Sequence, residues 1–362
     1  MSEARRQLDP NDELEDRRRD AAGAADRLAA RHQTCRIRRY RPGDDASIVA
    51  LMNRSFGADP LYAAKSVEWW RWKYLGNPAG HRTLCLEADD GRIVGHYGGS
   101  VTALRTPRGP LATTQICDAC IDPVLGVGLR RIGLFVRLAR SVVTFAEPAD
   151  IAAAYGLPVP DHFLLGSRLV EYWILRTQPV LVCRSRADLP RFPEGQIVED
   201  ADAVPEDFDG LSPALARAFP IHGDRSPAFQ KWRFFDAPGG PYRAGTVRSA
   251  GSRRLRGVAY YRSATFLGRR TGVIMDWLVP PEDREAGEAL LHWAAYQAVS
   301  DGLGELVFLC PPNCAWAPLF QSWGFFFEPT HYTMVFRPFD PALDHQSIRR
   351  DWYYTLADLD AL

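Results

Sequence analysis

The chain has 362 residues, of which 46% are hydrophobic and 11% aromatic, enough for one large domain or two ordinary ones. Its 44 basic and 44 acidic residues balance, so no overall charge draws it to nucleic acid or to an anionic membrane. Because no run of about 18 apolar residues occurs and the N-terminus is too charged for a signal peptide, we expect a cytoplasmic protein with no nucleic-acid or membrane partner.

The first half of the chain predicts an alternating series of strands and helices. Its first 34 residues are dense in charge and alanine and cannot bury an apolar face, so we expect a disordered extension there. We expect order to begin near Cys35 with a short strand, followed by a helix that ends at Gly57. Apolar runs on both sides of 89–91 predict a hairpin. A strand over 113–122, a helix over 131–146 and then a strand, a helix and a closing strand pair follow.

The second half repeats this order of elements. The segment WWRWKYLGNPAG at 69–80 returns as QKWRFFDAPGG at 230–240, and further matches follow in the same order. Several ordered matches at a nearly constant offset indicate a tandem duplication, joined near 190–202. The repeat pairs Ser66, Trp72, Lys73, Tyr74, Asp118 and 181–184 with Ser226, Trp232, Arg233, Phe234, Asp276 and 334–337.

The cysteines predict no disulfide framework and no metal site. There are seven, an odd number, in a chain without an export signal, which is typical of reduced thiols. Cys117 and Cys120 form a C-x-x-C pair, and Cys310 with Cys314 could supply the other half of a zinc site. However, residues three apart in a strand point to opposite faces, so we expect buried, hydrophobic cysteines instead.

The segment CDACIDPVLGVGLRRIGLFVRLA predicts a site for an anion. A strand leads into a loop and then into a helix whose first turn contains Arg130, Arg131 and Gly133. The first N–H groups of a helix lack partners, glycine lets a ligand approach the backbone, and arginines add charge-assisted hydrogen bonds. The helix dipole contributes only about 0.3–1 kcal/mol, so the amides and arginines must carry most of the binding. The ligand expected at such a junction is a pyrophosphate.

This strand–R-x-x-G–helix junction, within a β-α-β-β-β-α-β-α-β-β order, resembles the acyl-CoA-binding motif of the GCN5-related N-acetyltransferase (GNAT) superfamily. The segments WKYLGNPAG and GHYGG, and the closing DWYYTLADLD, resemble a bacterial branch in which two such domains are fused. The resemblance covers about 35–360. It implies an α/β fold of two GNAT-like domains, each a mixed, mostly antiparallel central sheet flanked by helices. The expected parts are a charged extension (1–34), the two domains (35–188 and 194–340) and a C-terminal tail (341–362).

The resemblance also implies which residues hold the cofactor, acetyl-CoA, without a metal. The end of the strand over 113–122 would pair with the pantetheine arm, and the following loop and first helical turn would hold the pyrophosphate. Two departures from the family pattern are a phenylalanine at a position usually occupied by glycine or alanine, and extra loop residues before Arg130. The implied contacts are Cys120, Ile121, Asp122, Leu129, Arg130, Arg131, Ile132, Gly133, Leu134 and Phe135.

The second half has its own R-x-x-G motif, from Arg284 to Gly287, with the usual spacing. There Glu285 and Glu288 would face the pyrophosphate, and like charges repel at that range. We therefore expect the first domain to bind the cofactor and the second to help form the acceptor cleft.

Transfer of an acyl group to an amine needs a deprotonated amine, a stabilised oxyanion and a proton for the leaving thiolate. Asp118 is our candidate base, although its repeat at Asp276 leaves a structural role open. Tyr155 and His162 flank the family's second cofactor-contacting segment, and either could protonate the thiolate. The carboxylate of Leu362 is a further candidate base, because some N-myristoyltransferases use a terminal carboxylate.

Candidate residues for binding the acceptor lie on the tryptophan segment and on the second hairpin strand. They are Trp69, Trp70, His96 and Tyr97, whereas Trp72 and Trp232 are expected to close the core.

We therefore predict an acyl-CoA-dependent N-acyltransferase, most simply one that transfers acetyl to a primary amine. The alternatives are an aminoacyl or long-chain acyl transferase on the same fold and a non-catalytic acyl-CoA sensor. Sugar amines, antibiotics, peptide N-termini and polyamines all remain open as small-molecule acceptors, and the protein is expected to be a monomer or homodimer.

Overall fold

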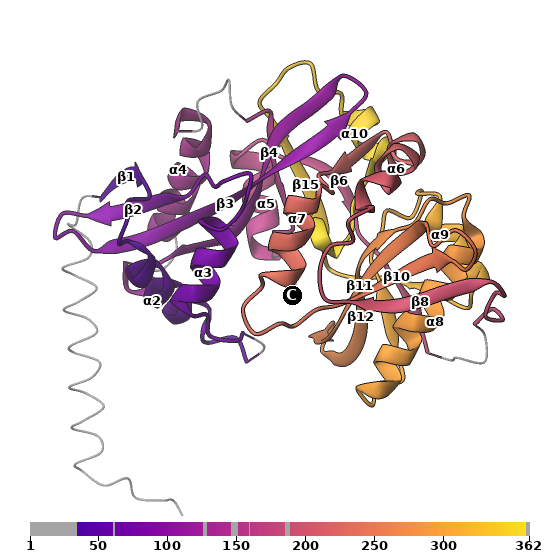
Figure 1. The fold of residues 1–362 in the computed structure, drawn as a ribbon. Helices are drawn as coiled ribbons and strands as arrows, with labels where there is room; N and C mark the ends of the chain where they lie inside the picture. The colour runs from indigo at the N-terminus through magenta and orange to yellow at the C-terminus, as the bar shows by residue number, and fades with distance from the viewer. Residues whose placement is uncertain are drawn as a thin grey trace, which may run out of the picture.

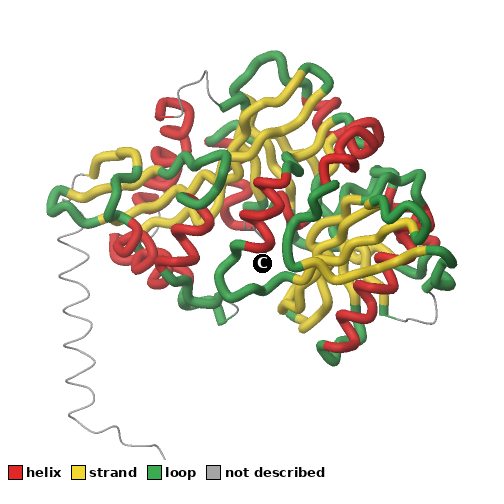
Figure 2. Tube along the Cα trace, in the orientation of Figure 1, coloured by secondary structure: helices red, strands yellow, loops and turns green. Residues whose placement is uncertain are grey.

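The structure of the protein is a computed structural model that describes residues 35–60, 62–125, 129–145, 151–158, 160–184 and 189–359. The predicted extension at 1–34 and the last residue, Leu362, lie outside the described residues. Figure 1 shows two lobes side by side, and Figure 2 shows that each is built on a sheet with helices against it. We call the lobe with the nine-stranded sheet the N-lobe and the lobe with the seven-stranded sheet the C-lobe.

The N-lobe sheet has the order β1-β2-β3-β4-β5-β15-β6, with β9 beside β3 and β16 beside β9. Its neighbouring strands are antiparallel except for β4 with β5 and β16 with β9. The strands are β1 (Cys35–Arg39), β2 (Leu84–Ala88), β3 (Ile93–Thr106), β4 (Gly109–Ile121), β5 (Ala153–Gly156), β6 (Trp173–Thr177), β9 (Ile221–Gly223), β15 (Thr333–Pro338) and β16 (Trp352–Tyr353).

The C-lobe sheet has the order β14-β7-β13-β12-β11-β10-β8, and its one parallel pair is β12 with β13. When it is read from β8, this order matches the N-lobe order strand for strand, so the predicted duplication and the α/β fold class are confirmed. The strands are β7 (Val180–Cys183), β8 (Gln196–Ala201), β10 (Arg243–Ser249), β11 (Leu255–Phe266), β12 (Arg269–Leu278), β13 (Leu306–Phe308) and β14 (Phe326–Glu328).

The last strand of each half lies in the sheet of the other half. β7 belongs to the first half of the sequence but lies between β13 and β14, whereas β15 belongs to the second half and lies between β5 and β6. The predicted pairing of the last two strands of each half is therefore wrong, because β6 and β7 lie in different sheets, as do β14 and β15. An apolar run predicts a strand but not the partner that it pairs with. The domain limits 35–188 and 194–340 remain predictions about folding units.

The helices cover both faces of the N-lobe sheet. Leu84 and Leu86 of β2 share a core cluster with α4, whereas Cys85 between them belongs to the cluster under α2 and α3. Since alternate residues of a strand point to opposite faces, α4 lies on one face and α2 and α3 on the other. The helices are α2 (Asp45–Phe56), α3 (Val67–Tyr74), α4 (Leu129–Phe145), α5 (Pro160–Leu169), α6 (Ser212–Ala218), α7 (Pro227–Gln230), α8 (Arg284–Ser300), α9 (Trp316–Ser322) and α10 (His345–Asp351).

The end of the described chain connects the two lobes. After α10, the segment 352–359 is almost wholly buried. Tyr353 donates a hydrogen bond to the Trp277 carbonyl (3.1 Å) and Tyr354 donates one to Gln178 (2.6 Å). Trp352 packs edge-on against Tyr155 of the N-lobe sheet. These contacts fix the position of one lobe relative to the other.

Candidate functional site

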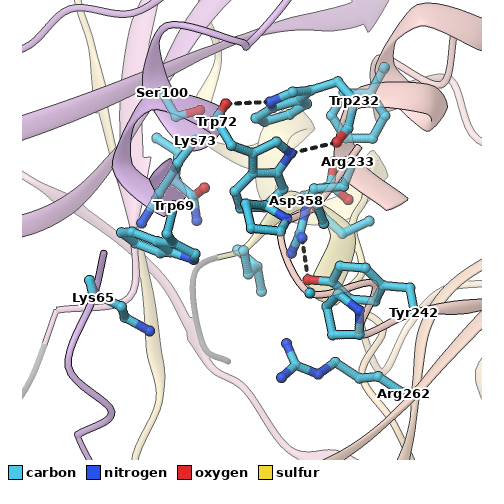
Figure 3. A pocket seen from close by; sticks show the side chains of 18 of the residues that line it. Lys65, Trp69, Trp72, Lys73, Ser100, Trp232, Arg233, Tyr242, Arg262 and Asp358 are labelled. Carbon is cyan, nitrogen blue, oxygen red and sulfur yellow. Dashed lines mark hydrogen bonds between the residues drawn. The ribbon is translucent and has the colours of Figure 1, made fainter. Parts of the chain in front are cut away.

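The repeated tryptophan segments meet at the boundary between the lobes. The Trp72 indole donates a hydrogen bond to the Trp232 carbonyl (2.7 Å), and the Trp232 indole donates one to the Trp72 carbonyl (2.8 Å). The two rings stack with centroids 5.7 Å apart (Figure 3). Equivalent residues that bind each other reciprocally are the signature of a twofold contact. The segment is therefore part of the surface through which the two halves dock.

Beside this contact lies a cavity of about 450 Å³, which we call the inter-lobe cavity. Figure 3 shows Lys65, Trp69 and Lys73 on one side of it and Arg233, Tyr242 and Arg262 on the other. Its remaining walls come from β3, β4, β5, α7 and the end of the described chain. Its lining includes Ser66, Trp72, Ser100, Val101, Thr102, Gln115, Tyr155, Phe229, Trp232, Pro238, Pro241, Ala357, Asp358 and Leu359.

A second cavity of about 190 Å³ lies inside the N-lobe, and we call it the strand cleft. The parallel pairing of β4 with β5 ends at Gln115 and Tyr155, and the cleft begins there. Gln115 and Tyr155 line both cavities, so the strand cleft and the inter-lobe cavity meet at these two residues. The other residues of the strand cleft are Phe56, Tyr97, Ile116, Cys117, Asp118, Ala119, Phe135, Ala154, Gly156, Leu157, Pro158, Tyr172 and Val335.

A bulge in β4 forms one wall of the strand cleft. Gly98 pairs with Cys117 and His96 with Cys120, so Asp118 and Ala119 together oppose one residue of β3. Asp118 has a φ of +51°, a left-handed conformation that is uncommon outside glycine and that aspartate tolerates better than most residues. A Cβ atom at Gly98 would collide with the hydroxyl of Tyr74, so this glycine makes room for the group that binds Asp118.

The Asp118 carboxylate is held by two donors from α3. Its Oδ2 accepts hydrogen bonds from Lys73 Nζ (2.8 Å) and Tyr74 Oη (2.6 Å), and its side chain is 11% exposed. Burial alone would raise the pKa of Asp118, but the Lys73 ammonium and the two hydrogen bonds outweigh it and lower that pKa. Asp118 is therefore a carboxylate at neutral pH. A base with a lowered pKa takes up a proton weakly.

Tyr155 lies at the junction of the two cavities. It is 4% exposed, and its hydroxyl donates a hydrogen bond to the Asp358 carbonyl (3.1 Å). Burial raises the pKa of Tyr155 well above its usual value. The backbone of His162 lies in α5, but its side chain is outside the described residues.

The implied cofactor residues at the end of β4 lie just beyond the strand cleft. Cys120 and Ile121 are buried in core clusters, and burial raises the pKa of the Cys120 thiol to about 12. Asp122 is also buried and pairs with Arg54 at 3.1 Å. The β4 residues that line the cleft are instead 115–119, which precede these three positions.

The first turns of α4 are open to solvent at Gly133. A Cβ atom there would meet nothing within 4 Å. Around it, Arg131, Ile132 and Leu134 are half-buried. The side chains of Leu129 and Arg130 are outside the described residues.

Phe135, the residue that departs from the family pattern, faces the strand cleft. Its ring centroid lies 6.2 Å from that of Tyr97 in β3. The Tyr97 hydroxyl lies 3.2 Å from the hydroxyl of Tyr172, which also lines the cleft. Tyr97 therefore contacts the strand cleft, whereas we expected it beside the acceptor.

The other candidate acceptor residues are placed differently from one another. Trp69 lines the inter-lobe cavity. Trp70 is fully buried and packs against Tyr40 and Tyr74, and it lines neither cavity. His96 is also fully buried, with Nδ1 bonded to the Asp118 carbonyl (2.8 Å), and burial lowers its pKa to about 4. It is therefore neutral at pH 7 and lies behind the wall of the strand cleft.

The matching region of the C-lobe is filled. A Cβ atom at Gly287 would come within 2.9 Å of both Trp316 and Trp323, so the glycine of the second R-x-x-G motif faces packed indoles. Trp277, where β12 leaves β13, is fully buried against Trp316 and Phe320. The space that is a cleft in the N-lobe holds a cluster of aromatic rings in the C-lobe.

Several residues of the site were not identified from the sequence. Gln115, Tyr242 and Arg262 line the inter-lobe cavity without belonging to any motif, and Asp358, in the closing segment DWYYTLADLD, was given no role. Arg233 could have been identified from the sequence, because the repeat pairs it with Lys73, and both residues line this cavity.

Apart from Cys117, which lines the strand cleft, the cysteines line neither cavity. Five of the seven cysteines are buried, and none of the seven forms a disulfide in the described part of the chain. Among the described residues, no three His, Cys, Asp or Glu side chains are grouped so that they could hold a metal ion. No helix in the described part of the chain is both long and apolar enough to cross a membrane.

No family model and no curated protein matches the sequence, but solved structures match the fold. A GCN5-related N-acetyltransferase from Kribbella flavida is 15% identical, with 86% of this chain and 72% of that chain covered and a TM-score of 0.61. A tandem GNAT protein from the clavulanic acid biosynthesis pathway is 14% identical (86% and 100% covered, TM-score 0.55). Saccharomyces cerevisiae N-myristoyltransferase with bound myristoyl-CoA is 12% identical (84% and 82%, TM-score 0.54). The chain has the tandem GNAT fold, as its motifs predicted.

Proposed function

We propose that this protein, which has the tandem GNAT fold, is an acyl-CoA-dependent N-acyltransferase that transfers acetyl from acetyl-CoA to a small-molecule amine. The observation that carries the proposal is the meeting of two cavities at Gln115 and Tyr155. The acyl donor would occupy the strand cleft and the acceptor amine would occupy the inter-lobe cavity. The nucleophile and the thioester would then meet where the cavities join, which is the arrangement that direct transfer needs.

In the proposed reaction the neutral amine attacks the thioester carbonyl. A C–N bond forms, the carbonyl oxygen becomes an oxyanion, and collapse of this intermediate breaks the C–S bond. The proton lost by the amine balances the one gained by the CoA thiolate. The pairing of β4 with β5 stops at Gln115, and the backbone groups of β4 beyond it would bind the pantetheine arm and the oxyanion.

Tyr155 and Asp118 have different places in this proposal. Tyr155 touches both cavities, and its hydroxyl would have to leave the Asp358 carbonyl in order to protonate the thiolate. Asp118 lines only the strand cleft and is paired with Lys73, which lines only the inter-lobe cavity. We assign this ion pair to positioning the wall between donor and acceptor.

Two observations support the N-lobe as the donor site and acetyl as the acyl group. Gly133 of α4 is open to solvent, whereas Gly287 of α8 is covered by indoles. The rings of Tyr97, Phe135 and Tyr172 line a strand cleft of about 190 Å³, below the roughly 300–1,000 Å³ of a typical drug-sized ligand site, and this favours a short acyl chain.

Calorimetric titration of acetyl-CoA into the full chain tests the donor site. Charge reversal in the Arg130→Glu/Gly133→Glu variant is expected to weaken binding at least tenfold, about 1.4 kcal/mol. The matched reversal Arg284→Glu in the first turn of α8 is expected to bind like the wild type. Weaker binding only in Arg284→Glu would move the donor site to the C-lobe. No binding by the wild type would refute the enzyme proposal.

Turnover separates the remaining alternatives. Release of free CoA thiol is measured with a panel of amines, and an acyl-CoA sensor would bind acetyl-CoA without releasing thiol from any of them. Replacement of acetyl-CoA by myristoyl-CoA tests the long-chain alternative, for which we expect no thiol release.

A further inference from the structure

The inter-lobe cavity is lined by more positively charged side chains than negatively charged ones. Four cationic side chains line it, Lys65 and Lys73 from the N-lobe side and Arg233 and Arg262 from the C-lobe side (Figure 3). One carboxylate, Asp358, lines it among the described residues. The chain as a whole has no net charge, so this excess is local to the cavity.

Nearby carboxylates neutralise only part of this charge. Asp118 pairs with Lys73 (2.8 Å). Asp358 is bound through Nη1 (2.7 Å) by the buried guanidinium of Arg225, which also pairs with Asp276, and among the described residues Asp358 makes no ion pair with Arg233 or Arg262. In the described part of the chain, neither Arg233 nor Arg262 has an ion pair.

Arg233 and Arg262 converge on one phenol ring. The Arg233 guanidinium donates a hydrogen bond to Tyr242 Oη (2.5 Å), and both guanidinium carbons lie 5.3 Å from the centroid of the Tyr242 ring. Arg233 is only 8% exposed, and Arg262 Nε is buried without a hydrogen-bond partner among the described residues. Burial alone would raise the pKa of Tyr242, but the two guanidinium groups lower it; as long as the phenol keeps its proton, it accepts a hydrogen bond without neutralising either cation. Buried cations without a counterion are costly unless a ligand supplies one.

We propose that Arg233 and Arg262 bind a carboxylate or phosphate group of the acceptor, so that the substrate is an amine that also carries an anion. This rests on the proposed function, because it assigns the acceptor to the inter-lobe cavity. Planar guanidinium groups suit both carboxylate and phosphate oxygens. The anion would sit on the C-lobe side, the amine would reach the junction at Gln115 and Tyr155, and Trp69 and Trp72 would contact the body of the substrate between them.

The positive charge of the inter-lobe cavity also affects the protonation of the acceptor amine. A substrate ammonium beside Lys73 and the arginines is disfavoured, because like charges favour its neutral form and lower its pKa. The neutral amine is the nucleophile, so the cavity promotes reaction with the form that attacks. Polyamines and other polycations, which carry no anion to offset the repulsion, are excluded as good acceptors.

Matched pairs of amines test the proposal in the thiol-release assay. The pairs are phenylalanine against phenylalanine amide and O-phosphoethanolamine against ethanolamine, with spermidine as the polycation. We expect kcat/KM at least tenfold higher for the anionic member of one pair, and which pair responds distinguishes carboxylate from phosphate. Arg262→Gln is expected to raise KM for that anionic amine by about 10²-fold and to remove the preference. Arg254→Gln, an exposed arginine outside both cavities, is expected to retain it.

A binding measurement independent of turnover makes the test decisive. Inorganic phosphate and benzoate are titrated against the tryptophan fluorescence of the wild type, Arg262→Gln and Arg254→Gln. Saturable binding of either anion that Arg262→Gln loses and Arg254→Gln retains supports the proposal. Equal kcat/KM within both pairs overturns it, as does the absence of arginine-dependent anion binding if no amine reacts. Because acetyl-CoA binding is measured separately on the same samples, failure of the anion site is distinguishable from failure of the proposed enzyme function.

Discussion

The two halves of this chain contain the same parallel strand pair. The space where the two strands stop pairing is an open cleft in one lobe and is filled with side chains in the other. β4 and β5 pair as far as Gln115 and Tyr155, and β12 and β13 pair as far as Ile274 and Phe308. Past that point the N-lobe has Cys117, Ala119 and Gly156 around a cleft. The C-lobe has indole and phenyl rings in the same space, those of Trp277, Phe308, Trp316 and Phe320. The topology creates a cleft, and side-chain volume decides whether it remains open.

The equivalent aspartates differ in the same way. Asp118 lines the strand cleft and pairs with Lys73, whereas Asp276 is fully buried, with Oδ2 2.7 Å from Arg225 Nε. Burial raises the pKa of Asp276 despite the Arg225 charge, whereas the pKa of Asp118 is lowered. One copy of the aspartate therefore serves a cavity wall, and the other forms part of the core between the lobes.

Removal of the largest ring from the filled cleft has the greatest expected effect on stability. Trp316→Ala is expected to lower the free energy of unfolding by about 3–5 kcal/mol, because a buried indole leaves a cavity. Urea unfolding measures this. Tyr296→Ala on α8, where the ring is 68% exposed, is the control and is expected to change stability by less than about 0.5 kcal/mol. Equal effects would mean that the aromatic cluster does not hold the C-lobe together.

The next largest loss of stability is expected when the ion pair between Lys73 and Asp118 at the strand cleft is broken. Lys73→Met leaves the Asp118 carboxylate without its cation, and we expect a loss of about 3 kcal/mol by urea unfolding. The double variant Lys73→Met/Asp118→Asn is expected to recover most of that loss, because no unpaired charge remains. A double variant as unstable as the single one would contradict a charge-pair origin.

The two aspartates are expected to give stability opposite dependences on pH. The lowered pKa of Asp118 contributes stability above the usual aspartate pKa of about 4, and this is lost as pH falls through the folded-state pKa. The raised pKa of Asp276 costs stability as pH rises above about 4. Urea unfolding between pH 3 and 7 is expected to show slope changes of opposite sign in Asp118→Asn and Asp276→Asn, each at most about 1.4 kcal/mol per pH unit. Slopes of the same sign would refute the contrast.

The smallest loss of stability is expected for substitutions at Trp72 and Trp232, which bond each other across the lobe boundary. Trp72→Phe and Trp232→Phe each remove one indole hydrogen bond across the lobe boundary, and each is expected to cost about 1 kcal/mol in urea unfolding. Because the contact is nearly symmetric, the two losses are expected to match. A loss several times larger in one variant would mean that the two halves do not share this contact equally.

Much of the fold could be predicted from particular residues. The echo of 69–80 at 230–240 predicted the duplication, and the strand–R-x-x-G–helix junction at 130–133 predicted the GNAT fold. The site was predicted less completely. Trp69 and Tyr155 do line the inter-lobe cavity, but Trp70 and His96 are core residues. The sequence could not separate these cases, because an aromatic residue near a motif has the same appearance whether it faces a cavity or a core.

By itself the sequence determined the order of elements, the tandem repeat and the charge contrast between Arg131 and Glu285, because these depend on local periodicity and on spacing along the chain. Only the tertiary structure decided that β7 and β15 exchange sheets, that rings from β12 and α9 fill one cleft, and that Arg233 and Arg262 converge on Tyr242. Each of these joins residues far apart in sequence. Which surfaces meet is decided by packing across the whole molecule, and no single segment contains that information.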